Sequence, residues 1–588
     1  MNQKAYIKSL NYRCGGSTMR HVISSGHEFL VFKAEEGTVD FYAYDTLFLS
    51  GIRLSTSVPL EPLEITRSSD EVVITYSGEG IRAVRRVKLG GGYRERVIFF
   101  SRADDERVIE GRYVFTVPMA DILERDYPQA SPQRKIEREG NVYAYLGMDG
   151  RRRTVRISGE SFRVSIPPRG FGRIEFSATP FVEGEFLLPT FRKASFQFNW
   201  KPLERVESAV YLRAIEDLEQ LIVDIDGYPF PLAGLPDFGA VFGRDSIWTA
   251  LFLLEEYPQI ARGVLKVLSR LQGKRFNAKT EEEPGKIPHE FRFGELCQAG
   301  VIPFNPYYGT VDATPLYVAL AGEYLKRTED RAFLDSIKNN LNMAVEWILR
   351  RLEEGGGYIR YDKTPLGLEN QGWKDWKNSI PDENGVQVKH PVAVVEVQGY
   401  AYLALKTASE LNLTDYDEKM LEKTAERLKR RFNKEFWTGE HYGIALDGEN
   451  RLSKVVSSNM GHLLITGILP EERARAVAER LIEGDMFSGW GIRTLSSKER
   501  AYDPFSYHNG SVWPHDNAII VLGLWKAGFK NQALKLASSL LNALYRLGKI
   551  PELFSGLEEL TPLPYANSPQ AWSAAGAVEL INLMEVKE

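Results

Sequence analysis

The feature that most constrains the fold is a change in hydrophobic period near residue 200. Before it come short segments rich in β-branched and aromatic residues, such as Val72–Tyr76, Val142–Leu146 and Phe162–Ile166, which partly alternate and are bounded by Gly, Ser or Asp. They follow one another without helical patterns between them, which is typical of an antiparallel β-sandwich. The sequence therefore predicts an N-terminal β-sandwich domain over residues 1–198.

From residue 199 to 588 the apolar residues recur at the spacing of amphipathic helices. About twelve such stretches start near residues 205, 245, 258, 314, 332, 394, 418, 457, 471, 511, 530 and 569. Asp330 and Asp417 stand where N-caps are expected, and Gly528 stands where a helix should end. Because a dozen helices can close as hairpins into a double-layered toroid, we expect an (α/α)6 barrel over this part of the chain.

Composition narrows the possible partners. The net charge of −5 is small for 588 residues, so we expect neither nucleic acid nor an anionic membrane as a partner. The longest apolar run, Ala518–Trp525, is too short to span a bilayer, and the first residues lack the apolar core of a signal peptide. These observations predict a cytoplasmic protein with a neutral substrate, and they leave the oligomeric state open.

Cysteine and histidine usage gives no metal signature. Cys14 and Cys297 are too few for a disulfide framework, and we expect free thiols in a reducing compartment. His289 and Glu290 are adjacent, but no second histidine follows at the helical spacing of a metalloprotease motif. No other His, Asp or Glu cluster has a convincing metal spacing. We therefore predict no metal and no cofactor.

Two acids stand in apolar surroundings that suit sugar chemistry. Asp375 lies between Trp373 and Trp376, and Glu552 lies in the otherwise apolar run Pro551–Phe554. Indole rings stack on the apolar faces of sugars, and their low dielectric raises a carboxyl pKa so that it holds a proton near neutral pH. Two such acids brought together make a candidate glycosidase pair. The plainer interpretation of the first segment is a surface loop with two half-buried Trp, in which Lys374 forms an outward salt bridge or tunes Asp375.

Further polar and aromatic residues gather at predicted helix starts and in the long loops 274–313, 355–393 and 485–510, and loops of that length are usually functional. Either Asp245 or Ser246 caps the helix and Arg244 forms a surface ion pair with Asp245, or Asp245 binds two sugar hydroxyls while Arg244 holds it ionised. Thr314 is expected to cap the helix that starts near residue 314. The candidate substrate-binding residues are Arg244, Asp245, Trp248, Glu290, Tyr308, Asp312, Trp373, Lys374, Trp376, Glu396, Gln398, Trp490, Arg493, His508 and Trp513.

These motifs, in this order, resemble those of the amylo-α-1,6-glucosidases (glycogen-debranching glycosidases) and, more distantly, those of glucoamylases, trehalases and processing α-glucosidases. The resemblance is dense from about residue 225 to about residue 580. It rests on the segments Phe242–Ser246, Glu283–Ile287, Asn370–Asp375, Glu396–Tyr400, Ser488–Thr494 and Tyr507–Asp516. In the N-terminal part, only Tyr44–Ser50 resembles the signature of the β-domain found in such enzymes.

The resemblance implies a β-sandwich packed on a catalytic (α/α)6 barrel that hydrolyses α-glucosidic bonds of glycogen or branched oligosaccharides with inversion. Carried over by position, Asp375 matches the general acid, Glu552 the general base, and Asp245 with Arg244 the pair that grips the terminal glucose. Family members commonly have Ser after the acid. In this chain the position holds Trp376, whose ring could stack on the leaving-group sugar or restrict the site to short linear substrates.

The resulting hypothesis is a single displacement in which Asp375 protonates the glycosidic oxygen and Glu552 activates water, with the carboxyl groups ~6.5–9.5 Å apart. The alternatives are an α-glucosidase for short linear substrates, an inverting disaccharide phosphorylase that uses phosphate in place of the base, and a sugar epimerase on the same barrel. A glycan-binding protein without activity would tolerate loss of Glu552. No α-amylase-type barrel pattern is present, so we expect no transferase half.

Overall fold

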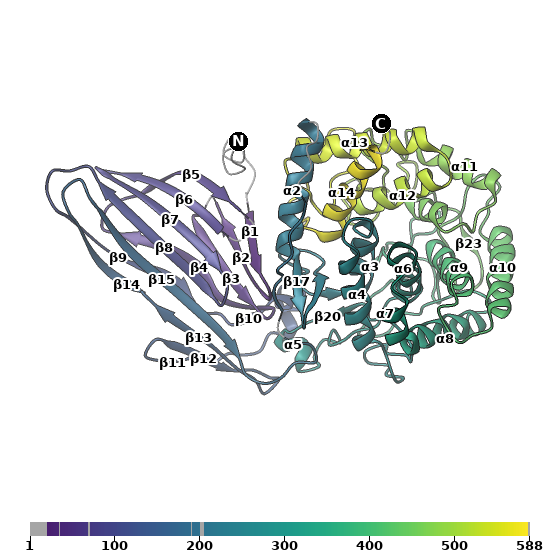
Figure 1. Ribbon diagram of the computed structural model, residues 1–588, viewed down its shortest axis with the longest axis horizontal. Coiled ribbons are helices and arrows are strands. Elements are labelled where there is room, and N and C mark those ends of the chain that lie inside the picture. The colour runs from purple at the N-terminus through teal and green to yellow at the C-terminus, as the bar shows by residue number, and fades with distance from the viewer. Residues whose placement is uncertain (1–19, 35, 69–70, 190, 200–204, 586–588) are drawn as a thin grey trace.

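The computed structural model describes residues 20–34, 36–68, 71–189, 191–199 and 205–585. Strands fill the N-terminal part of these residues and helices fill most of the rest (Figure 1), which confirms the predicted fold class. Cys14 lies outside the described residues, and so does the stretch 200–204, where the period changes. The domain boundary at residue 198 therefore stays a prediction.

The N-terminal part consists of two antiparallel sheets. One sheet has the strand order β1-β2-β3-β4-β9-β14, with β10 paired to β4, and the other has the order β11-β12-β13-β15-β8-β7-β6-β5. The strands are β1 (Arg20–Ser25), β2 (Glu28–Lys33), β3 (Thr38–Ala43), β4 (Thr46–Thr56), β5 (Glu61–Arg67), β6 (Glu71–Gly78), β7 (Ile81–Leu89), β8 (Tyr93–Ser101), β9 (Arg107–Thr116), β10 (Ala120–Asp121), β11 (Glu137–Glu139), β12 (Val142–Leu146), β13 (Arg152–Ser158), β14 (Ser161–Ile166) and β15 (Phe171–Val182). The three strand segments predicted from the sequence lie in β6, β12 and β14.

Alternating side chains of the two sheets form one core, because successive residues of a strand point to opposite faces. In β7, for example, Ile81, Ala83 and Val87 are buried while their neighbours are exposed or half-buried. The same core holds a buried ion pair in which Arg85 donates to Glu95 (2.8 Å), and this pair is tolerated because tyrosine hydroxyls also donate to the carboxylate.

The helical part is a closed ring of inner helices surrounded by outer helices. The inner elements are α3 (Gly243–Phe252), α6 (Ala313–Thr328), α9 (Val395–Glu410), η4 (Ser458–Ile465), α12 (Pro514–Lys526) and α14 (Ala571–Glu585), each in contact with the next, and α14 contacts α3. The outer helices are α4 (Pro258–Leu271), α8 (Lys338–Glu354), α10 (Glu418–Glu435), α11 (Glu471–Leu481), α13 (Lys530–Leu547) and α2 (Arg205–Leu221). This arrangement is the predicted (α/α)6 barrel.

The remaining elements are short. They are η2 (Ile122–Arg125), η3 (Pro128–Ala130), β16 (Arg192–Lys193), β17 (Ile222–Ile225), β18 (Tyr228–Pro231), β19 (Val241–Phe242), β20 (Glu290–Phe291), α5 (Glu295–Gln298), α7 (Arg331–Ser336), β21 (Ala393–Val394), β22 (Ala445–Leu446) and β23 (Leu452–Ser453).

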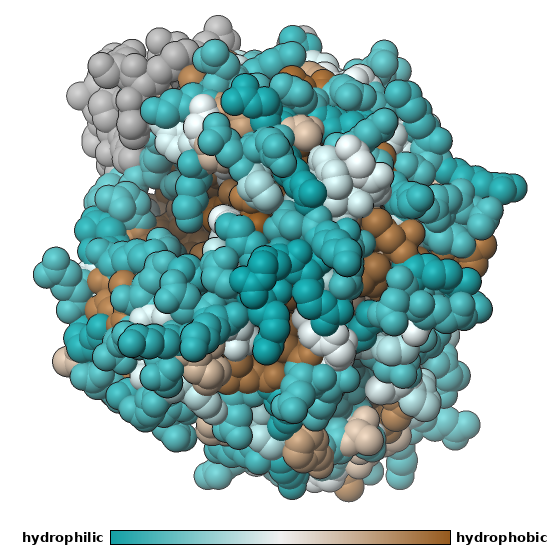
Figure 2. Space-filling model, turned by 90° about the vertical axis from the view of Figure 1, so that its right-hand side faces the viewer, coloured by the Kyte–Doolittle hydropathy of each residue, from teal (hydrophilic) through white to brown (hydrophobic). Residues whose placement is uncertain are grey.

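Burial explains which helices lie inside. The outer helix α10 buries only Leu421, Ala425, Leu428 and Phe432, a stripe at helical spacing on one face. The inner helix α12 is buried on nearly all sides, which suits the apolar run that begins at Ala518. The end of the molecule that carries α8, α10 and α11 is accordingly covered mostly by hydrophilic side chains, with small separate hydrophobic areas (Figure 2). Among the described residues, no helix has the length and apolarity needed to cross a membrane.

The predicted helix starts agree with the structure to within a few residues, and Asp330 and Asp417 are confirmed as N-caps, since each accepts a hydrogen bond from a backbone N–H of the first turn. The stretch near 457 is a 3-10 helix instead of an α-helix. The predicted cap at Thr314 is wrong, because α6 begins at Ala313 and the Thr314 hydroxyl accepts from Ile287 N instead.

The capping role considered for Asp245 and Ser246 is also wrong. Helix α3 begins at Gly243, so both residues lie inside its first turn, and the Ser246 hydroxyl donates back to Gly243 O. The carboxylate of Asp245 is therefore not used as a cap and is available for other contacts.

The Tyr44–Ser50 segment of the sandwich contacts the barrel. Asp45 Oδ2 accepts a hydrogen bond from Phe293 N (2.8 Å), and Asp45 Oδ1 lies 3.7 Å from Arg292 Nη1. Tyr145 Oη, on the other sheet, donates to Glu295 Oε1 (2.8 Å). The N-terminal segment that resembles the β-domain signature is thus part of the seam between the two parts of the chain.

Candidate active site

The candidate site lies where the inner elements begin. Asp245 is in the first turn of α3, Asp312 directly precedes α6, Glu396 is in the first turn of α9, and Asp516 is in the first turn of α12. All four side chains are buried. The positive ends of helix dipoles favour negative charge, so a ring of helix starts is a suitable place for several carboxylates.

Arg244 joins three of the segments that the sequence singled out. Its Nη1 donates to Asp312 Oδ2 (3.2 Å) and to Gly372 O (3.0 Å), and its Nη2 donates to Asp375 Oδ2 (2.9 Å). The adjacent Asp245 is more distant, with 3.9 Å between Arg244 Nε and Asp245 Oδ1. A buried guanidinium is stable only when it is paired in this way, so Arg244 fixes the Asp375 segment against the starts of α3 and α6.

Asp375 opens toward solvent and titrates near neutral pH. Its side chain is 22% exposed, more than the side chains of Asp245 and Glu552. Partial burial raises the pKa of Asp375 to about 6, and the positive charge of Arg244 opposes this shift. His289 Nε2 lies 4.0 Å from Asp375 Oδ2, and burial lowers the pKa of His289 well below its usual value, so this imidazole is neutral.

Glu552 is held deeper and entirely by hydrogen-bond donors. Tyr507 Oη donates to Glu552 Oε1 (2.5 Å), and the backbone N and the Nδ2 of Asn567 both donate to Glu552 Oε2 (3.2 Å each). Burial raises the pKa of Glu552 to about 7, while these donors, which favour the carboxylate, lower it. The result is a fixed carboxyl group that titrates near neutral pH.

The two acids share electrostatic neighbours. Burial raises the pKa of Asp245 to about 7, and the charges of Asp375 and Glu552 push it in the same direction. Burial, together with the same two charges, raises the pKa of Tyr507 well above 10. Because each acid acts on both Asp245 and Tyr507, the three carboxylates and the tyrosine surround one region of the barrel.

The tryptophan and lysine beside Asp375 face inward. Trp373 is buried, stacks on His462 and makes an edge contact with Trp513. Lys374 is fully buried and donates to Thr494 O (2.6 Å), and burial lowers the pKa of Lys374 to about 8. The outward salt bridge considered for Lys374 is therefore wrong. Trp376, in contrast, is exposed.

Several of the predicted residues use their polar atoms to hold the framework. Tyr308 Oη donates to Leu271 O (2.7 Å), and the side-chain amide of Gln398 bonds to the backbone N and O of Ile359 (3.0 Å each). Arg493 donates to Gly556 O (2.6 Å), which fixes the loop that carries Glu552. These contacts are structural, and a role of the same residues in substrate binding stays a prediction.

The remaining predicted residues lie around this framework. Trp248 packs against Phe252 and Tyr400, Glu290 accepts from Arg292 Nε (3.0 Å), and Trp490 Nε1 donates to Glu558 O (2.8 Å). His508 Nδ1 lies 3.1 Å from Ser379 Oγ, and Trp513 Nε1 donates to Tyr507 O (2.8 Å). The structure thus brings Arg244, Asp245, Asp312, Asp375 and Glu552 together. Glu290, Trp248 and Trp490 contact other residues, although the pKa of Glu290 is raised by burial and also by the charge of Asp375.

Sequence reasoning missed two residues that position Glu552. Tyr507 lies in a segment that carried the family resemblance, so its position in the motif was a usable signal. Asn567 lies in a loop with no motif, and its role depends on how the chain returns to the site. The side chain of Asn567 is itself held in place, because Asp237 N donates to Asn567 Oδ1 (3.0 Å).

Buried polar atoms without protein partners lie at the starts of the inner elements. They include both carboxylate oxygens of Glu396, both side-chain atoms of Asn459, both ring nitrogens of His515 and Asp516 Oδ2. An unpartnered buried polar group costs free energy, so these atoms suit water or the hydroxyls of a ligand. Within the described residues no group of three or more His, Cys, Asp or Glu side chains is arranged to hold a metal, and the metal-free site stays a prediction.

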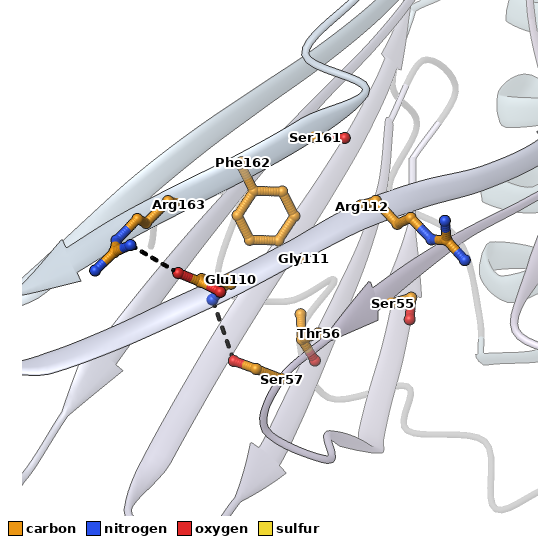
Figure 3. A pocket seen from close by; sticks show the side chains of 9 residues that line it. All are labelled: Ser55, Thr56, Ser57, Glu110, Gly111, Arg112, Ser161, Phe162 and Arg163. Atoms are coloured by element: carbon orange, nitrogen blue, oxygen red, sulfur yellow. Dashed lines mark hydrogen bonds and ion pairs between the residues drawn. The ribbon is translucent and has the colours of Figure 1, made fainter.

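Two shallow surface pockets lie away from these residues. The first, of about 460 Å³, crosses β4, β9 and β14 on the sandwich (Figure 3). There Phe162 covers Gly111, and Arg163 pairs with Glu110 (3.0 Å). The second, of about 470 Å³, lies beside the start of α10. Neither pocket is lined by a predicted site residue.

Comparisons with known proteins give the fold and the family. A GH63 mannosylglycerate hydrolase from Thermus thermophilus, solved in complex with Tris, aligns with a TM-score of 0.50 and 16% identity, covering 63% of this chain and 99% of that chain. An uncharacterized conserved protein from the same organism aligns with a TM-score of 0.48 and 15% identity, covering 63% and 99%. At 16% identity, the likeness to the hydrolase shows a shared fold.

A search of curated proteins by sequence finds no significant match. The profile of the amylo-alpha-1,6-glucosidase family matches residues 281–579, roughly half of the chain, and this range contains Asp375 and Glu552. The chain therefore belongs to the amylo-alpha-1,6-glucosidase family of glycoside hydrolases.

Proposed function

We propose that the protein hydrolyses α-glucosidic bonds of glycogen or branched oligosaccharides with inversion, with Asp375 as general acid and Glu552 as general base. The observation that carries this proposal is that Tyr507 donates to Glu552 and contacts the ring of Trp376, which directly follows Asp375. Burial also raises the pKa values of Asp375 and Glu552, to about 6 and about 7. Carboxyl groups that titrate near neutral pH can give up or take a proton during the reaction.

The two roles follow from exposure and hydrogen bonding. Asp375 is the more exposed carboxyl, so it faces the side from which a leaving group enters and departs. Glu552 acts only as a hydrogen-bond acceptor, and its donors are Tyr507 and Asn567. Such donors favour the carboxylate form that a base needs. Asp375 then gives its proton to the glycosidic oxygen, and Glu552 takes a proton from the water that attacks the anomeric carbon on the opposite face.

Binding of one terminal sugar fits the groups beneath the acids. Asp245 and Arg244 lie beside Asp375, and the unpartnered atoms of Glu396, Asn459 and His515 lie where neighbouring inner elements begin. Sugar hydroxyls both donate and accept, so a glucosyl unit would satisfy such atoms. Because the inner elements close a ring around them, we infer a pocket for the non-reducing end of a chain. The family match favours the α-1,6 bond as its target.

The decisive experiment measures hydrolysis of panose, isomaltose, maltose, trehalose, kojibiose and branched dextrins in phosphate-free buffer. We expect Asp375→Asn and Glu552→Gln each to lower kcat by roughly a thousandfold or more, since each removes one proton-transfer group. Glu558→Gln, six positions after the base and exposed, is the matched control and should keep full activity. Near wild-type rates in either acid variant would remove that assignment.

The stereochemistry is read separately. A proton NMR time course on the best α-linked substrate should show the β-anomer of the released sugar first. An initial α-anomer would exclude inversion, and cleavage that requires added phosphate would instead indicate a phosphorylase.

A further inference from the structure

Three large aromatic side chains are exposed around the candidate site. Trp376 is 54% exposed, Phe505 is 50% exposed and Tyr565 is 47% exposed. They come from three loops that are far apart in the sequence and that precede the inner helices α9, α12 and α14. Exposed aromatic groups that gather in one place mark binding surfaces, because burying them against a partner is favourable. We refer to these three residues as the aromatic rim.

The rim is connected to the proposed base through Tyr507. The Tyr507 ring makes an edge contact with Trp376 (centroids 6.3 Å apart) and a tilted contact with Tyr565 (6.5 Å). Tyr565 Oη donates to Phe505 O (2.5 Å), which joins the third loop to the second. Tyr507 itself donates to Glu552. Trp376 and Tyr565 therefore contact the tyrosine that holds the proposed base, and Phe505 is joined to Tyr565 through its backbone.

The rim lies on the leaving-group side. Trp376 follows Asp375 in the chain, and Asp375 is more exposed than Asp245 (9% of its side chain) or Glu552, which is fully buried. A general acid protonates the departing oxygen, so the sugar that departs lies next to the acid. Trp376, the residue next to the proposed acid, belongs to the rim and is linked to Tyr565 through Tyr507.

We propose that the aromatic rim is the platform on which the sugars of the leaving group stack, and that the substrate is an α-linked oligosaccharide with two or more sugars on that side. This inference rests on the proposed function. Pyranose rings have apolar faces that pack on aromatic rings, and an indole offers the largest such surface. A small non-sugar leaving group would leave the rim in water, so the rim selects for a chain.

The test compares substrates with and without leaving-group sugars. The full chain and its variants Trp376→Ala, Tyr565→Ala and Phe505→Ala are assayed on α-glucosyl fluoride, which has no leaving-group sugar, and on panose and maltotetraose. We expect Trp376→Ala to lower kcat/KM about tenfold on the better oligosaccharide and to change it less than about twofold on the fluoride. Trp376→Phe should restore most of the loss, because it keeps an aromatic face.

Phe171→Ala is the matched control, since Phe171 is a 71% exposed aromatic on the sandwich strand β15. If the rim variants lose kcat/KM equally on the fluoride and on the oligosaccharides, the rim is merely structural and the inference is overturned. The inference is also overturned if the rim variants lose no activity on either substrate. If the wild-type protein hydrolyses neither kind of substrate, the proposed function fails. In that case the affinity for maltotetraose, measured by calorimetry, still tests the inference. The rim variants should bind maltotetraose more weakly than the wild type does, and Phe171→Ala should bind it as tightly.

Discussion

At the scale of single residues, burial raises the pKa values of the proposed acid and base toward neutral pH and also destabilises the folded chain. Glu552 and Asp245 are buried, and burial raises the pKa of each to about 7. A carboxyl whose pKa is higher in the folded state than in the unfolded state is costly to keep ionised. The same shift that makes these groups useful near neutral pH therefore works against stability above it.

We predict that Glu552→Gln stabilises the protein at alkaline pH. The pKa of Glu552 is raised from 4.5 to about 7, so the folded state binds its proton more tightly than the unfolded state does. The cost of ionisation is absent below pH 4.5 and is complete above about pH 7, where it reaches about 3 kcal/mol. Thermal unfolding at pH 4.5 and pH 8 should show a higher midpoint for the variant at pH 8 only. A variant less stable at both pH values would contradict the prediction.

We predict a narrow bell-shaped pH profile. The proposed mechanism needs Asp375 protonated and Glu552 ionised. Because the pKa of Asp375 (about 6) is lower than that of Glu552 (about 7), only a minority of the molecules hold both forms at once, and activity falls below about pH 6 and above about pH 7. The maximum of kcat/KM should lie between these values. Tyr507→Phe removes a donor that lowers the pKa of Glu552, so it should move the alkaline limb, which follows the higher of the two pKa values, to higher pH.

The measurement for Tyr507→Phe is kcat/KM on α-glucosyl fluoride from pH 4 to pH 9. A parallel loss at every pH, with no displacement of the alkaline limb, would mean that Tyr507 supports only the local packing. His508→Gln is a useful comparison, because His508 contacts Tyr507 but has no contact with Glu552.

At the scale of elements, the inner helices supply the site through their first turns, and the outer helices supply stability. Asp417 shows the second role. It caps the outer helix α10 by accepting a hydrogen bond from Met420 N (2.8 Å), far from the carboxyl cluster. Its contribution should therefore appear in unfolding and be absent from catalysis.

We predict that Asp417→Ala lowers the free energy of unfolding by about 1 kcal/mol, because it leaves a first-turn N–H without an acceptor. Asp417→Asn keeps the acceptor and should be close to wild type. Denaturant unfolding measures the difference, and kcat on the best substrate should be unchanged in both variants. Unequal activities would show that the end of α10 reaches the site by a route that the hydrogen bonds do not reveal.

At the scale of the whole molecule, the seam between sandwich and barrel continues into the site. Arg292, which lies beside Asp45, donates to Asp237 O (3.0 Å). Asp237 N donates to Asn567, and Asn567 donates to Glu552. A chain of polar contacts thus runs from the sandwich segment Tyr44–Ser50 to the proposed base.

We predict that Asp45→Ala destabilises the protein by about 2 kcal/mol, because it leaves the buried Phe293 N without an acceptor and removes a charge beside Arg292, and that it also lowers kcat severalfold by loosening Asn567. Asp45→Asn keeps an acceptor for Phe293 N and should lose less. Thermal unfolding and kcat on α-glucosyl fluoride are measured together. Lost stability with an unchanged kcat would show that the seam does not position Glu552.

The sequence by itself determined what local patterns encode. The change of period separates strands from helices, the apolar spacing gives nearly every helix start, and the apolar surroundings of Asp375 and Glu552 mark both as candidate acids. These properties depend on residues within a few positions of each other, because helix and strand periods and caps are local. The family resemblance added the expected role of each acid.

Only the tertiary structure decided which of the singled-out groups meet. Arg244 bonds to Asp375, 131 positions away, more closely than to its neighbour Asp245. Gln398 and Tyr308 spend their polar atoms on backbone, while Asn567, which carried no motif, holds Glu552. The physical reason is that these contacts form only when the inner helices close into a ring, and ring closure depends on the packing of the whole barrel.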